Sequence, residues 1–156
     1  MPTAQAAYRA CRRLHTGQLC LRERGMAMRW FDRSERKEVW DEAIAWPIGD
    51  IEAAQKIRQI CHSAAGSAEK VGAFGGGASK KHQREHERYE RAARKAMEIA
   101  MKISDELLRD ASVRQIVDLC MKANNVKTAQ TLFRAIQAKS IRNEVLRDHS
   151  TLRDDE

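Results

Sequence analysis

The sequence predicts an all-α fold in which a helical hairpin and a three-helix bundle are joined by a glycine-rich linker. Only two prolines occur in 156 residues, so little interrupts helices along most of the chain. Aromatic residues make up 5% of the chain and charged residues 33%, as is typical of water-soluble helical proteins. Apolar residues recur every three or four positions through residues 34–65 and 80–147, which places the helices there.

Residues 1–33 form a basic N-terminal segment that we expect to be poorly ordered. They carry seven arginines, among them Arg9, Arg12 and Arg13, against two acidic residues, so most of the net charge of +7 lies here. Their apolar residues show no sustained helical period. The segment could be a flexible arm that favours anionic partners, a targeting peptide or an over-extended reading frame. The alternative is a short helix at about residues 3–14 followed by a loop.

Residues 34–65 are expected to form a helical hairpin. Ser34 can cap its first helix and Pro47 ends that helix, while Asp50 can cap the second. Nearby aromatic side chains are expected to form a local core: Trp30, Phe31, Trp40 and Trp46.

Residues 66–79 are rich in glycine and are expected to form a linker, because glycine loses much conformational entropy in a helix. A phosphate-binding loop would need the pattern G-x-x-x-x-G-K-[ST] between a strand and a helix. The sequence offers neither the Gly-Lys pair nor the strand, so we expect no nucleotide site here.

Residues 80–147 are expected to fold as a three-helix bundle, followed by an acidic tail at 148–156. The first helix should run to about Arg109. Its alanine-rich seam has heptad spacing and is the expected surface for homo-oligomerisation: Ala93, Ala96, Ala100, Ile103 and Leu107.

The two remaining helices of this bundle are placed by their caps. Ser112 and Gln115 form a capping-box pair that should open the second helix. Asn124 and Asn125 suit the turn that closes it, and the third helix should begin near Val126.

The clearest chemical pattern is His82-Gln83-Arg84-Glu85-His86, which has the spacing H-x-x-E-H of a zinc-binding helix. On a helix, His82, His86 and Glu90 share one face and could hold a metal. The flanking residues are charged throughout, whereas a catalytic zinc site needs a dry cleft. We therefore favour a solvated charged face and expect neither a catalytic residue nor a cofactor.

Nucleic-acid binding is the main alternative function. Residues 112–138 supply a helix, a short turn and a second helix, which resembles the order of elements in a helix-turn-helix, although ordinary antiparallel packing explains the pattern equally well. Basic residues on the arm, on the 80–95 helix face and on the last helix are the candidate contacts: Arg9, Arg12, Arg13, Lys80, Lys81, Arg84, Arg88, Lys127 and Arg134.

The function that the sequence favours is a non-enzymatic, cytoplasmic helical module that binds another protein. No stretch approaches the length of a membrane span, and the four cysteines are widely spaced, as expected of reduced thiols. Cys61 and Cys120 fall on apolar helix faces, where we expect them to be buried.

Overall fold

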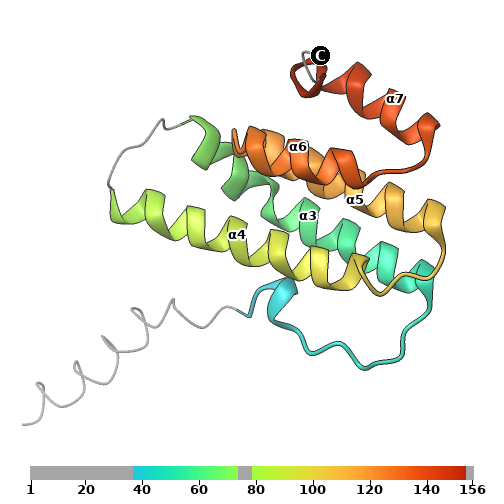
Figure 1. Ribbon diagram of the computed structural model, residues 1–156. Helices are drawn as coiled ribbons and strands as arrows, with labels where there is room; N and C mark the ends of the chain where they lie inside the picture. Colours follow the sequence, from blue (N-terminus) through green and yellow to red (C-terminus); the bar gives the residue numbers. More distant parts are fainter. Residues whose placement is uncertain (1–36, 74–78, 154–156) are drawn as a thin grey trace, which may run out of the picture. The chain divides into compact units, whose positions relative to one another are not determined.

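The computed structural model describes residues 37–73 and 79–153, and confirms the all-α class for this part of the chain, which contains no strand (Figure 1). Its elements in order are η2 (Val39–Asp41), α3 (Asp50–Ala73), α4 (Lys80–Ala100), α5 (Glu106–Lys122), α6 (Val126–Ala135), α7 (Lys139–Asp148) and η3 (Ser150–Leu152). None of these helices has the length and apolar character needed to cross a membrane. Residues 1–33, with the expected basic segment, lie outside the described residues.

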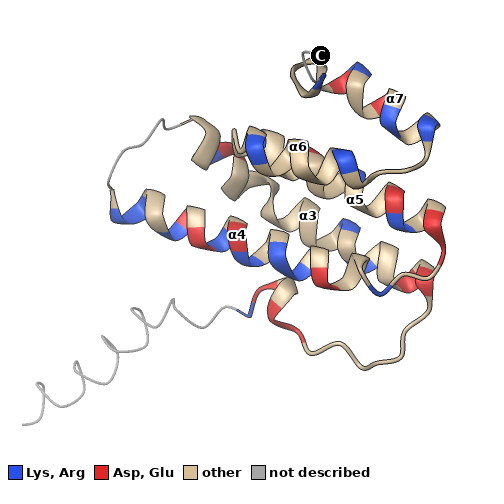
Figure 2. Cartoon of the chain, in the orientation of Figure 1, with Lys and Arg blue, Asp and Glu red and all other residues tan. Residues whose placement is uncertain are grey.

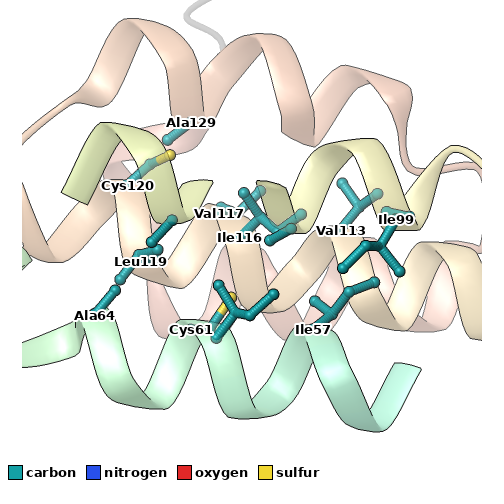
Figure 3. Packing of buried hydrophobic residues seen from close by; sticks show 14 of the residues in the cluster. Ile57, Cys61, Ala64, Ile99, Val113, Ile116, Val117, Leu119, Cys120 and Ala129 are labelled. Carbon is teal, nitrogen blue, oxygen red and sulfur yellow. The ribbon is translucent and has the colours of Figure 1, made fainter. Parts of the chain in front are cut away.

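The core lies between α3, α4 and α5, and α6 covers α5 (Figure 1). Side chains of α3 and α5 meet there with Ile99 of α4, and Cys61 and Cys120 are buried among them as expected (Figure 3). Many core positions are alanine, which lets the helix backbones approach closely. The fully buried alanines are Ala64, Ala68, Ala92, Ala96, Ala100 and Ala129.

The expected first helix of the hairpin is wrong for the residues that the structure describes. Between residues 37 and 49 the chain makes one 3-10 turn, η2, and then runs without regular structure to α3. Trp40 in η2 is buried, and Ile44 and Ile48 pack against the core from the irregular stretch. The apolar residues of this segment therefore have helix-like spacing in the sequence, but the segment is not an α-helix and instead packs these side chains against the core.

The predicted start of the linker at residue 66 is too early in the sequence, because α3 continues through Gly66 and Gly72 to Ala73. Gly72 lies where α3 approaches the end of α5 so closely that an added Cβ atom would be less than 3.0 Å from the carbonyl oxygen of Lys122. Glycine is thus required there by packing rather than by flexibility. Because α3 packs on α4 and α5, the expected hairpin and bundle contribute to one core.

The predicted long helix to Arg109 is two helices, α4 and α5. The break is held by Asp50, whose carboxylate accepts the backbone N–H groups of Ser104 at 3.1 Å and Asp105 at 2.8 Å. Asp105 then caps α5 by accepting the N–H of Leu108 at 2.7 Å.

The predicted capping box at Ser112 is also wrong. Ser112 lies within α5, buried, and its hydroxyl donates to the carbonyl oxygen of Leu108 at 2.7 Å. The hydroxyl that the sequence assigns to a helix start therefore bonds back along the same helix.

The turn after α5 is confirmed. Asn124 adopts a φ of 57°, a left-handed conformation that asparagine tolerates, and the Asn125 side chain caps α6 by accepting the N–H of Thr128. The third helix, however, is broken into α6 and α7. Asp110 of α5 accepts the N–H groups of Gln137 at 2.9 Å and Ala138 at 2.8 Å, which holds the break.

The expected tail at 148–156 is structured over most of its length. It begins with the end of α7, and η3 follows. Leu152 of η3 is fully buried, so apolar burial anchors this end of the chain. His149 Nε2 also lies 2.8 Å from Asp118 Oδ1 of α5. Residues 154–156 lie outside the described residues.

Substituting alanine at the two helical glycines of α3 should have opposite effects. Gly72→Ala should lower the free energy of unfolding by about 1–3 kcal/mol, because its Cβ would collide with the α5 backbone. Gly66→Ala should raise it by about 0.5–1 kcal/mol, because the added Cβ atom would have no neighbouring group within 4 Å beyond its own helix turn, and alanine favours the helix. Urea unfolding of both variants measures this, and effects of the same sign would contradict the close approach.

Candidate functional site

Four large apolar side chains are exposed in the part of the chain that the structure describes, and we call this set the apolar end. They are Trp46, Ile51, Met101 and Leu107, with exposed fractions of 42%, 68%, 69% and 60%. No local pattern in the sequence marks this set as a site. Leu107 was assigned to a packing seam, but it lies in the first turn of α5.

Two contacts show that these side chains belong to one region. Asp50, next to Ile51, bonds the backbone of Ser104 and Asp105 between α4 and α5. Lys102, next to Met101, places its ammonium group 4.0 Å from the centroid of the Trp46 ring. The start of α3, the end of α4 and the start of α5 accordingly lie at the same end of the bundle (Figure 1).

Acidic residues lie beside the apolar end. Glu52 in the first turn of α3, and Asp105 and Glu106 at the start of α5, are exposed and form no ion pair within the described residues. Figure 2 shows this acidic colour at the starts of both helices. The basic groups nearby include Lys102, whose ammonium group lies over the Trp46 ring, the half-buried Arg109, and Lys56, which pairs with Glu42.

A hollow of about 350 Å³ lies between α3 and the segment that precedes it. Its lining is partly apolar and partly polar: Ala43, Ile44, Ala45, Ile48, Glu52, Gln55, Lys56 and Gln59. Glu52 belongs both to this hollow and to the rim of the apolar end, so the two features adjoin.

The residues predicted to contact nucleic acid are dispersed. Lys80, Lys81 and Arg84 are exposed near the start of α4 and form no ion pair within residues 37–73 and 79–153. Arg88 is instead engaged with Glu38 at 2.9 Å and Glu85 at 3.5 Å. Lys127 and Arg134 are exposed on α6, while Arg9, Arg12 and Arg13 lie outside the described residues.

The predicted metal ligands are only partly gathered. His86 Nδ1 lies 3.8 Å from Glu90 Oε2, and both side chains are exposed. His82 is half-buried, and its Nδ1 atom has no hydrogen-bond partner. Within the described residues, no group of three or more His, Cys, Asp or Glu side chains is arranged to hold a metal ion.

The predicted oligomerisation seam is mostly inside the molecule. Ala96, Ala100 and Ile103 are buried in the chain's own core, and Ala93 is partly buried against it. A partner could not reach these side chains without opening the core. This surface is therefore wrong as an interface, because intramolecular packing already uses it.

The two described cysteines are poor nucleophiles. Burial, with smaller effects from Cys120 and Asp118, raises the pKa of Cys61 to about 12. Burial also raises the pKa of Cys120, despite the opposing effect of a hydrogen bond from Tyr89. Both thiols remain protonated at neutral pH and act as small core side chains.

Comparison of the chain with protein-family models, with curated proteins and with solved structures finds no match in any of the three.

Glu85 ties α4 to α3. Its carboxylate accepts hydrogen bonds from Ser67 Oγ at 2.7 Å and Lys70 Nζ at 3.0 Å. Burial acts to raise the pKa of Glu85, but these hydrogen bonds and the charges of Lys70 and Arg88 outweigh burial, so the pKa lies below its usual value. Glu85 thus has a structural role on the face that carries the predicted metal ligands.

We expect Glu85→Gln to lower the free energy of unfolding at pH 7 by about 1 kcal/mol. Because the folded pKa is depressed, the carboxylate stabilises the fold above its unfolded pKa of about 4.3, and this contribution is lost as pH falls through the folded pKa. Urea unfolding from pH 7 down to pH 3 should show the two proteins converging. Glu87→Gln, at an exposed position without an ion pair in the described part, is the control and should have little effect at either pH.

Proposed function

We propose that the protein is a non-enzymatic helical module that binds another protein, and that the apolar end is its docking surface. The observation that carries the proposal is that all four of the large apolar side chains found exposed lie in one region. Scattered exposed apolar residues are ordinary on protein surfaces, whereas a group of them is typical of an interaction site.

The chemistry of this region fits binding better than catalysis. Its apolar side chains are Trp, Ile, Met and Leu, and Trp and Met are enriched at protein interfaces. The carboxylate of Asp50 is already engaged by two backbone N–H groups. What the region offers a partner is apolar area with a polar rim, as in protein docking sites.

The test compares the full chain with the double variant Met101→Gln, Leu107→Gln. Both side chains are mainly exposed, so the free energy of unfolding should change by less than about 0.5 kcal/mol. A protein captured by the full chain from cell extract, and then purified, should bind the variant at least about 10-fold more weakly, as expected for loss of two interface anchors.

The matched control is Lys139→Gln, Arg147→Gln, which changes two exposed residues of α7. The control should bind the purified partner with the affinity of the unaltered chain. If every purified partner binds the apolar-end variant with unchanged affinity in calorimetry, the proposal is wrong.

Nucleic-acid binding is a second candidate, supported by the start of α4. Acidic side chains commonly occupy the first turn of a helix because the helix dipole is positive there. The first turn of α4 has none and instead carries Lys80 and Lys81, with Arg84 one turn later. With Lys127, Arg134 and the arginines of residues 1–33, this arrangement would suit a polyanion.

Salt dependence tests this second candidate. Lys80→Gln, Lys81→Gln, Arg84→Gln should reduce the slope of log K against log salt for duplex DNA by up to about 2.7, if each side chain contacts one phosphate. Fluorescence anisotropy between 50 and about 300 mM salt gives the slope. The α7 double variant removes two charges elsewhere and should leave the slope nearly unchanged; equal slopes for all three proteins would contradict this candidate.

A further inference from the structure

Acidic residues are unevenly distributed among the helix starts. In the described part of the chain, α3 and α5 have acidic residues in their first turns, whereas α4, α6 and α7 have none. All five helices have the same positive dipole at their starts. The two helices that begin with carboxylates are those that begin at the apolar end.

These carboxylates are available to a partner. Glu52 and Glu106 are exposed and have no ion pair within the described residues. Most other acidic side chains of the described bundle have a partner, as Glu85 has Lys70 and Glu144 has Arg114, whereas Glu87 on α4 has none. An acidic rim around apolar side chains on a protein with net charge +7 is a local reversal of sign, and such reversals select partners of opposite charge.

We infer that the partner of the apolar end is a basic amphipathic segment, in which Lys or Arg side chains flank a row of apolar side chains. This inference rests on the proposed function. The apolar row would cover Met101 and Leu107, and the basic flanks would lie against Glu52 and Glu106. Charge complementarity of this kind governs partner choice more than it adds raw affinity.

A second copy of the chain meeting through the same end fits less well. A symmetric interface places the same surface on both subunits. The carboxylates of Glu52, Asp105 and Glu106 from both subunits would then be gathered at one interface, and like charges placed together are unfavourable. The inference therefore favours a different, basic protein over a symmetric dimer.

The experiment uses the full chain and three labelled 18-residue helical peptides as probes. The first has leucines spaced at i, i+3, i+4 and i+7 with lysines elsewhere, the second replaces the lysines by glutamates, and the third replaces the leucines by serines. Anisotropy should show the leucine-lysine peptide binding at least about 10-fold more tightly than either other peptide.

Two variants and a control locate the contact. Glu52→Gln, Glu106→Gln should weaken binding of the leucine-lysine peptide by about 2- to 10-fold and reduce its salt dependence, as expected for exposed ion pairs. Met101→Gln, Leu107→Gln should remove most of the binding. Lys139→Gln, Arg147→Gln on α7 should leave the affinity unchanged.

The outcomes separate this inference from the proposed function. If the lysine and glutamate peptides bind equally, and both lose affinity in Met101→Gln, Leu107→Gln, the surface docks apolar segments but the charge inference is wrong. If no peptide binds and light scattering shows a dimer that Met101→Gln, Leu107→Gln dissociates, the inferred basic partner is wrong and the apolar end binds a second copy of the chain. If no peptide binds and the chain is monomeric, the inference is also overturned, while the proposed function is decided by its own purified partner.

Discussion

The close approach of α3 to α4 and α5 is the constraint that governs how this fold packs. Small side chains permit that approach: Ala64 and Ala68 on α3 face a core that also contains Ala92 and Ala96 of α4, all fully buried. Gly72 extends the same constraint to the end of α3, where an added Cβ would meet the α5 backbone. With the helices this close, residues such as Ile57 and Ile116 fill the remaining space and remove apolar area from water.

Two aspartates fix where helices begin through the same type of hydrogen bonding. Asp50 accepts two successive backbone N–H groups before α5, and Asp110 accepts two before α7. The N–H groups at a helix start have no partner within the helix, so a carboxylate from a neighbouring helix can satisfy such groups and position the chain at the same time. Each hydrogen bond joins segments that are distant in sequence and fixes the backbone of the connection between two helices.

These aspartate–backbone hydrogen bonds explain what could and could not be predicted from the sequence. Apolar periodicity was sufficient for the all-α class and for the burial of Cys61 and Cys120, and the local chemistry of Asn124 was sufficient for its turn. The helix ends near Ala100 and Ala135 depend on the distant Asp50 and Asp110, which no local pattern contains. The candidate surface was missed for the same reason: Leu107 continues a heptad rhythm, but the break before α5 turns it to solvent.

The same bonds would also favour the docking that is proposed for the apolar end. Exposed side chains such as Met101 and Leu107 add little to the stability of the fold, because they remain in contact with water. Their backbone positions are nevertheless fixed, since Asp50 holds the segment between them against the start of α3. A partner docking there, as proposed, would meet apolar groups whose backbone is already ordered, so little further conformational entropy would be lost on binding. The exposed apolar side chains proposed to bind a partner are thus distinct from the buried side chains that form the core.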